Sequence, residues 1–160
     1  MKFMKATLLY VLKDNKILLG EKLRGFGIGK INGIGGKVDP GETVDDAMIR
    51  ETKEEIGVFP IDAKCVAKLT YYEKFNGEDT KLETYVFITD KIDGKPSKSS
   101  EMNPMWFDVD EIPYGKMFGD DEFWLPQVLS GKCVEAEFWF DDDFKIIKQN
   151  VKEVENIVVS

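Results

Sequence analysis

The sequence predicts a mixed α/β (α+β) sandwich, and three observations support this class. Apolar, β-favouring runs bounded by turn residues dominate the chain. One helix is well marked in the first half, and a second helical segment lies in the last third. The chain has 160 residues, of which 42% are hydrophobic, enough to bury one core. We therefore expect a single domain over residues 1–160, with helices packed on a sheet.

The N-terminal third begins with a predicted hairpin. The apolar runs "KATLLYVL" and "KILLGEKL" are separated by "KDN", which favours a tight turn. The next segment, "RGFGIGKINGIGGKV", is too rich in glycine for a helix. We expect it to be a loop whose backbone can approach other groups closely.

A helix is expected from about Val44 to Ile56. Thr43 can accept a hydrogen bond as its N-cap, with Asp46 three residues on, and Gly57 can end it.

The remainder of the chain reads mainly as strands. We expect a second strand pair around a polar turn, a loop before a short strand, a turn followed by a helix, and a final hairpin around "DDD". The corresponding segments are "KCVAKLTYYEKF" and "LETYVFITD" around "NGEDTK", "GKPSKSSEMNP" before "MWFDV", "DEIPYGKMFGDDEFWLPQVLSG", and "CVEAEFWF" with "FKIIKQNV".

Composition excludes several kinds of function. The formal net charge is −8 and the pI about 4.7, so nucleic acid is a poor partner. A small anionic substrate would need a cation between itself and the protein. The absence of histidine excludes Ser-His-Asp and Cys-His nucleophile systems and HExxH zinc sites. Acid-base and metal chemistry must therefore fall to carboxylates.

The cysteines and the N-terminal segment bear on location. Cys65 and Cys133 are far apart and fit no CxxC pattern, which favours free thiols in a reducing compartment. The apolar stretch from Ala6 to Leu12 is too short to span a membrane and is followed by no cleavage site. We expect a cytoplasmic monomer without a membrane partner.

Three glutamates lie on one face of the predicted helix. At about 100° per residue, Glu51, Glu54 and Glu55 continue the stripe that Val44 and Met48 begin. Carboxylates at this spacing repel one another by a few tenths of a kcal/mol per pair, roughly, even when exposed. The stripe is either a solvated acidic face or a site for a hard divalent cation.

The loop and helix together resemble the Nudix hydrolase family. Gly36, five residues, Glu42, seven residues and "RETKEEIGV" match the family signature G-x5-E-x7-R-E-U-x-E-E-x-G-U. The one departure is Thr52, where the signature has a bulky apolar residue. The resemblance implies an α/β/α sandwich around a mixed sheet, with the signature forming a loop, a helix and a loop.

The resemblance also assigns roles to residues of the signature. It implies that Glu51, Glu54 and Glu55 bind Mg²⁺, or alternatively Mn²⁺, joined by the carbonyl of Gly35. It further implies that Arg50 and Glu42, with Gly36, hold the helix and loop in position.

Beyond the signature, most of the chain is similar to the animal-type 8-oxo-dGTPase branch of the family. "RGFGIGKINGIGGKVDPGET", "SSEMNPMWF" and "DDEFWLP" carry this similarity, in the same order. It implies a further metal-site carboxylate, Glu101. It also implies a base-binding site made by a set of seven residues: Thr7, Phe26, Asn32, Phe118, Asp120, Asp121 and Trp124. Phe118 stands where the branch has Trp, which offers a smaller surface for stacking on a base. Without the resemblance, "GDDEFW" would be read as a helix N-cap followed by a core Trp.

The resemblance implies Mg²⁺-dependent hydrolysis of oxidised purine nucleoside triphosphates to monophosphate and pyrophosphate. Glu55 and Glu101 are the candidates for the general base, with Glu54 as a further catalytic carboxylate. Two alternatives stay open: a Nudix hydrolase of another nucleoside diphosphate linkage, such as a dinucleotide, ADP-ribose or a nucleotide sugar, and a non-catalytic nucleotide-binding module.

Overall fold

The computed structural model describes all residues from Met1 to Ser160. The elements, in chain order, are β1 (Lys2–Lys13), β2 (Lys16–Lys22), β3 (Ile31–Asn32), α1 (Val44–Ile56), β4 (Phe59–Ile61), β5 (Lys64–Phe75), β6 (Glu78–Thr89), β7 (Lys91–Asp93), β8 (Met102–Asp108), the 3-10 helix η1 (Tyr114–Lys116), α2 (Asp121–Leu129), β9 (Cys133–Phe140) and β10 (Ile146–Val154). No helix is long and apolar enough to cross a bilayer.

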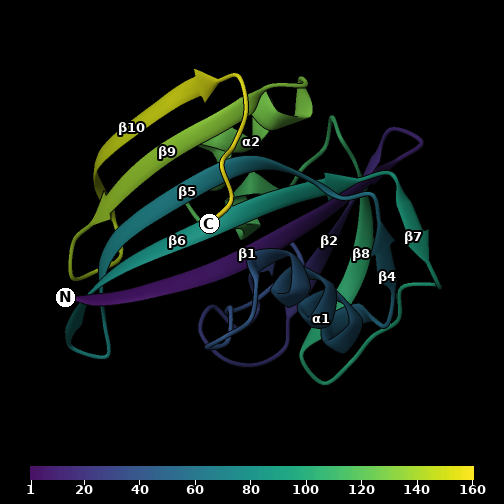
Figure 1. Ribbon diagram of the computed structural model, residues 1–160, viewed down its shortest axis with the longest axis horizontal. Helices are drawn as coiled ribbons and strands as arrows, with labels where there is room; N and C mark the ends of the chain where they lie inside the picture. Colours follow the sequence, from purple (N-terminus) through teal and green to yellow (C-terminus); the bar gives the residue numbers. More distant parts are fainter.

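One large mixed sheet organises the chain. Its strands follow the order β10-β9-β5-β6-β1-β2-β3 (Figure 1). An eighth strand, β8, lies outside this order and also pairs with β2. The pairs β1–β6 and β5–β9 are parallel, and the remaining pairs in this sheet are antiparallel. β4 and β7 form a separate two-stranded sheet beside α1.

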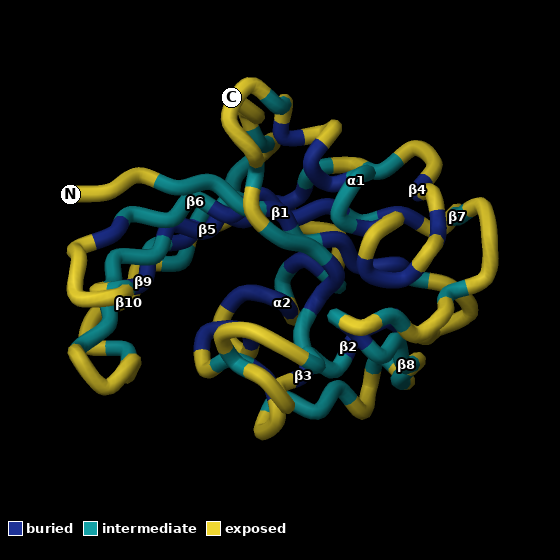
Figure 2. Tube along the Cα trace, turned by 90° about the horizontal axis from the view of Figure 1, so that it is seen from below, coloured by how far each residue is buried: buried dark blue, intermediate teal, exposed yellow.

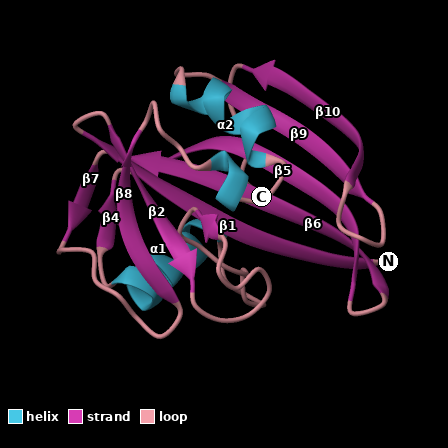
Figure 3. Cartoon of the chain, turned by 180° about the vertical axis from the view of Figure 1, so that it is seen from behind, coloured by secondary structure: helices cyan, strands magenta, loops and turns pink.

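The two α-helices cover opposite faces of the sheet. β1 lies between α1 and α2 (Figure 2), and the view from behind places α2 in front of the strands (Figure 3). Alternation along β1 explains this: Leu9 and Val11 pack in the cluster under α1, while Tyr10 packs in the cluster under α2. The predicted mixed α/β sandwich is therefore confirmed.

The predicted helix boundaries are confirmed by the contacts that cap α1. The side chain of Thr43 accepts the backbone N–H of Asp46 at 3.1 Å. Gly57 ends the helix in the left-handed conformation, with φ of 75°. The departure from the signature is accommodated, because Thr52 is fully buried and donates its hydroxyl to the carbonyl oxygen of Met48 at 2.7 Å.

The predicted hairpins are present, but several strand boundaries were wrong. β1 begins at Lys2 rather than Lys5, and β10 covers Ile146–Val154 rather than residues 144–151. The turn between β5 and β6 is Asn76–Gly77 alone, and the polar residues from Glu78 to Lys81 belong to β6. An Asn-Gly pair supplies both positive φ angles of a two-residue turn, so the strands can begin at once. β8 begins at Met102, inside the segment predicted as a loop, because residues 102–108 pair with β2. The short strands β3, β4 and β7 were not predicted.

Candidate active site

Helix α1 carries its acidic stripe toward the Gly-rich loop. The first turns pack Val44, Ala47 and Met48 into the core, and the same face continues with Glu51 and Glu55. Glu55 is buried and the side chain of Glu51 is only 14% exposed, whereas that of Glu54 is 49% exposed. The helix thus places two largely buried carboxylates and one exposed carboxylate at the loop.

Two glycines allow the loop to fit between β1 and α1. Thr7 donates its backbone N–H to the carbonyl oxygen of Gly36 at 2.8 Å, which ties the loop to β1. A Cβ on Gly35 would lie 1.8 Å from the Thr7 carbonyl oxygen, and a Cβ on Gly36 would lie 2.5 Å from the carboxyl carbon of Glu51. Only glycine leaves room for this approach. As a result the Gly35 N–H donates to Glu55 Oε1 at 2.7 Å.

Arg50 holds the loop and the helix together. Its Nε and Nη2 donate to the two carboxylate oxygens of Glu42, at 2.7 and 2.9 Å. Nη2 also donates to the Lys37 carbonyl oxygen at 3.0 Å, and Nη1 to Glu51 at 2.9 Å and Glu54 at 3.2 Å. A planar guanidinium with five donors suits this geometry, which a lysine could not reproduce.

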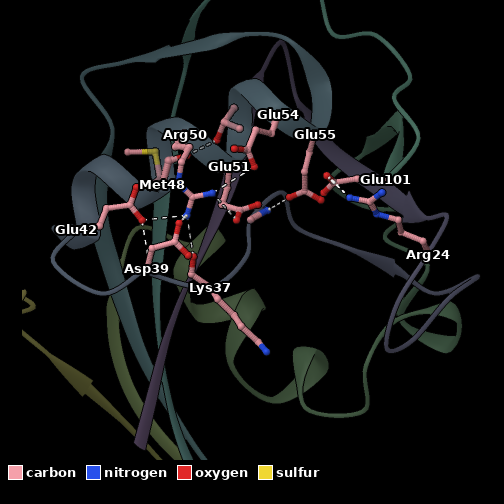
Figure 4. A network of polar contacts seen from close by, with 12 residues as sticks. Arg24, Lys37, Asp39, Glu42, Met48, Arg50, Glu51, Glu54, Glu55 and Glu101 are labelled. Atoms are coloured by element: carbon pink, nitrogen blue, oxygen red, sulfur yellow. Dashed lines mark hydrogen bonds and ion pairs between the residues drawn. The ribbon is translucent and has the colours of Figure 1, made fainter.

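Glu101 reaches the same region from the segment before β8. Its carboxylate accepts Arg24 Nη2 at 2.6 Å, and its carbonyl oxygen accepts the Leu23 N–H. Figure 4 shows the carboxylates of Glu51, Glu55 and Glu101 in a row between Arg50 and Arg24. The contact joins the segment before β8 to the loop that carries Phe26, a predicted base-binding residue.

The acidic groups perturb one another. Burial, followed by the charge of Glu51, raises the pKa of Glu55 to about 8, against the lowering effect of the Gly35 N–H; the charge of Glu101 adds to the rise. Burial also raises the pKa of Glu51, although Arg50 acts in the opposite direction. In this arrangement, no group of three acidic side chains is gathered closely enough to ligate one metal ion. The carboxylates are instead engaged by Arg50, Arg24 and the Gly35 N–H.

A cavity of about 560 Å³ opens beside these acids. Its wall includes Gly35 and Gly36, so it begins where Glu55 is held, and it extends along β1, β5 and β6 to the start of α2. Six of the seven predicted base-binding residues line it: Thr7, Phe26, Asn32, Phe118, Asp120 and Asp121. The structure therefore brings together residues that are spread over more than a hundred positions of the chain.

The two aspartates form one end of the cavity, and both are buried. Asp120 Oδ2 accepts the hydroxyl of Tyr71 at 2.7 Å and the Nε1–H of Trp124 at 2.9 Å. Asp120 precedes α2 but makes no side-chain capping bond. Trp124 is fully buried behind Asp120 and is absent from the cavity wall, so the structure places it in a supporting position.

Four phenylalanines outside both core clusters line the cavity: Phe26, Phe118 and Phe144 come from loops, and Phe75 is the last residue of β5. Phe26 stacks on Phe118 with ring centroids 6.0 Å apart and an interplanar angle of 22°. Phe75 and Phe144 contact the same Phe26 ring, at centroid distances of 5.8 and 5.3 Å. Exposed aromatic faces of this kind can stack on a nucleobase.

Cationic and anionic groups both line the cavity. Lys22, Lys30 and Lys37 line it, and the charge of Lys22 lowers the pKa of Glu55, which places this lysine near the acidic stripe. Acidic groups occur at the aspartate end, where the charge of Asp120 adds to burial in raising the pKa of Glu73. The arrangement suits a ligand with anionic groups near Gly35 and hydrogen-bonding groups near the aspartates.

Sequence reasoning missed several residues of the cavity wall. Tyr71, Glu73 and Phe75 alternate along β5 and line the cavity. This period of two in "TYYEKF" could have indicated that the three share one face. Nothing in the sequence indicated that this face lies against Asp120, because the contact joins positions 49 residues apart.

The fold and the acidic helix define a class of protein. The NUDIX domain profile matches residues 2–128, so the chain belongs to the Nudix hydrolase family. It is 38% identical over 151 residues to the oxidized purine nucleoside triphosphate hydrolase of Danio rerio, covering 94% of this chain and 96% of that protein. It is 37% identical over 150 residues to the enzyme of the same name from Mus musculus, covering 94% and 95%.

Solved structures agree on the fold. The MutT protein of Bacillus halodurans superimposes with a TM-score of 0.81 at 22% identity, covering 92% of this chain and 97% of that chain. A MutT NUDIX hydrolase from Burkholderia pseudomallei superimposes with a TM-score of 0.64 at 26% identity, covering 71% and 88%.

Proposed function

We propose that the protein hydrolyses oxidised purine nucleoside triphosphates, such as 8-oxo-dGTP, to the nucleoside monophosphate and pyrophosphate. The observation that carries this proposal is a single cavity with Asn32, Asp120 and Asp121 in its wall, opening beside the glutamates of α1. The relatives from Danio rerio and Mus musculus, which carry the name oxidized purine nucleoside triphosphate hydrolase, support the same substrate class.

The base would lie between the aspartate end and the phenylalanines. A carboxylate accepts a hydrogen bond from a purine N–H, and a protonated neighbour donates to a carbonyl oxygen. Asn32 offers both an acceptor and donors. Phe26 and Phe118 now contact each other, so a stacked base would rest on this pair or separate the two rings.

The acids of the signature fit Mg²⁺ or Mn²⁺ in the kind of donor they offer. Glu51, Glu54, Glu55 and Glu101 offer hard oxygen ligands. Burial, followed by the charges of Glu51 and Glu101, raises the pKa of Glu55, and a divalent cation would offset the repulsion among these carboxylates. When bound, the cation neutralises triphosphate oxygens and lowers the pKa of an attacking water. The carbonyl of Gly35 is a further proposed ligand.

The remaining roles belong to the protein itself. Glu55 or Glu101 would accept the proton from water, with Glu54 as a further catalytic carboxylate. The lysines that line the cavity would orient the triphosphate. Arg50 and Glu42 would keep the helix and loop in register, because both carboxylate oxygens of Glu42 are already used by Arg50.

The protein would act as a monomeric single domain, residues 1–160, on free nucleotides in the cytoplasm. Nucleic acid and membrane are not proposed as partners. A net charge of −8 supports a small ligand over a phosphate backbone.

The test is pyrophosphate release with Mg²⁺ from dGTP, 8-oxo-dGTP and 2-hydroxy-dATP, compared by kcat/KM. ADP-ribose and a diadenosine polyphosphate are followed by their nucleotide products. A strong preference for the oxidised purines, weakened in Asn32→Ala and Asp120→Asn, is the expected result. Turnover confined to the diphosphate-linked compounds would overturn the substrate class, and absence of any Mg²⁺-dependent product would indicate a binding module.

A further inference from the structure

Asp120 receives two hydrogen bonds on one oxygen. The hydroxyl of Tyr71 and the Nε1–H of Trp124 both end on Asp120 Oδ2, at 2.7 and 2.9 Å. An oxygen that carries a proton offers fewer lone pairs to outside donors than an ionised one. Two donors at a single buried oxygen therefore favour the charged form of this carboxyl.

Asp121 is in the opposite situation. It is buried and lines the cavity, and its Oδ2 has no hydrogen-bond partner in the protein. Burial, followed by the charge of Asp120, raises the pKa of Asp121 well above its usual range. Burial also raises the pKa of Asp120, but the bonds from Tyr71 and Trp124 act against that rise. A proton shared by this pair therefore resides on Asp121.

The other titratable groups around the pair do not reverse this distribution. Glu73 faces Asp120 from β5, Tyr10 from β1 faces both aspartates, and Tyr114 from η1 and Glu122 from α2 lie near Asp121. All four are acids or phenols, and neither aspartate has a lysine or arginine among the groups that shift its pKa. The charge on Asp120 is thus stabilised by Tyr71 and Trp124.

We propose that Tyr71 is a positioning residue that sets the hydrogen-bonding order of the base site, with Asp120 as the acceptor and Asp121 as the donor. The inference rests on the proposed function, because it takes a purine base to lie against the two aspartates. Guanine carries an acceptor, O6, where adenine carries a donor, the N6 amino group. If the acceptor and the donor keep fixed positions, the two aspartates can pair with only one of these two base edges. Tyr71 therefore makes the enzyme selective between guanine-type and adenine-type bases.

The experiment compares the wild type with Tyr71→Phe, which removes one hydroxyl and keeps the ring. The measured quantity is the ratio of kcat/KM for 8-oxo-dGTP and 2-hydroxy-dATP, over a range of pH. The ratio should move toward unity by about tenfold, the scale of a lost hydrogen bond to a charged group. The acid limb of kcat/KM should move up by about one pH unit, because a less stabilised carboxylate protonates more readily.

Tyr72→Phe is the matched control. Tyr72 neighbours Tyr71 on β5, but its hydroxyl donates to Glu137 at 3.1 Å, and it does not line the cavity. This variant should keep both the wild-type ratio and the wild-type acid limb. The assignment would be overturned if Tyr71→Phe left both the kcat/KM ratio and the acid limb unchanged. It would also be overturned if both variants changed these two quantities equally. A purely structural role for Tyr71 would alter thermal stability alone.

Binding of 8-oxo-dGMP and 2-hydroxy-dAMP, measured by calorimetry, separates this inference from the proposed function. If the wild type binds one monophosphate selectively and Tyr71→Phe binds it less selectively, the role of Tyr71 is supported even when no triphosphate is hydrolysed. Absence of hydrolysis would overturn the proposed function alone. Binding of both monophosphates with equal affinity by the wild type, or of neither, would overturn the inference about Tyr71.

Discussion

Substitution of Phe144 should affect ligand binding more than folding. This residue lies in the turn between β9 and β10, where Asp141 Oδ1 accepts the backbone N–H groups of Asp143 and Lys145 at 2.9 and 3.0 Å. Its φ is 57°, in the left-handed region that a bulky side chain rarely adopts. Its ring contacts Phe26 and lines the cavity, yet it remains 42% exposed. We therefore expect the ring to contribute more to nucleotide binding than to stability.

The expected magnitudes follow from these observations. Full burial of a Phe side chain contributes about 1.5–3 kcal/mol, so a roughly half-buried ring contributes about 1 kcal/mol to stability. The left-handed conformation costs a non-glycine residue about 1 kcal/mol. Phe144→Ala should therefore lose about 1 kcal/mol of unfolding free energy, and Phe144→Gly should stay near the wild type because relief of the backbone offsets the lost ring. Both should raise KM by about 5- to 150-fold if the ring stacks on a base, which is worth about 1–3 kcal/mol.

The assays are urea denaturation for stability and pyrophosphate release for KM. Phe123→Ala is the control, because Phe123 is 38% exposed on α2 and does not line the cavity. It should lose a similar amount of stability at unchanged KM. Equal KM values in Phe144→Ala and Phe123→Ala would refute the reasoning, as would a large destabilisation of Phe144→Gly.

Three further outcomes are expected. Glu55→Gln should lower kcat at least about 100-fold if Glu55 is the general base, while Glu101→Gln should leave a larger residual rate. Single-turnover measurements test this, and a lower residual rate in Glu101→Gln than in Glu55→Gln would assign the role to Glu101. Arg50→Ala should lose about 2 kcal/mol of unfolding free energy, because its charge-assisted bonds to three carboxylates and a carbonyl disappear. A loss below 0.5 kcal/mol, roughly the scale of an ordinary surface substitution, would contradict this expectation. The bond from Arg50 lowers the pKa of Glu42 from 4.5 to about 2, so the stabilisation by this ion pair is present above pH 4.5 and is lost as the pH falls toward 2. The acid denaturation profile of Glu42→Gln should lack the loss of stability between these two pH values. A profile identical to that of the wild type would contradict this expectation.

The helix α1 was predictable in detail because its determinants are local. Its N-cap, its glycine C-cap and its acidic stripe depend on residues within four positions of one another, and the structure keeps the predicted ends. Strand ends were less predictable. The start of β8 at Met102 depends on pairing with β2, about eighty residues earlier in the chain, and the residues themselves show no β pattern there.

The sequence by itself determined the family signature, the spacing that aligns Glu51 and Glu55, and the absence of any imidazole chemistry. Only the tertiary structure decided that Trp124 lies behind Asp120, that Tyr71 donates to the same oxygen, and that Glu101 is held by Arg24, 77 residues away. The physical reason is the range of the interactions. Helix periodicity and capping act over one turn of the chain, whereas the cavity wall depends on the register of β1, β5 and β6 and on where α2 packs against them.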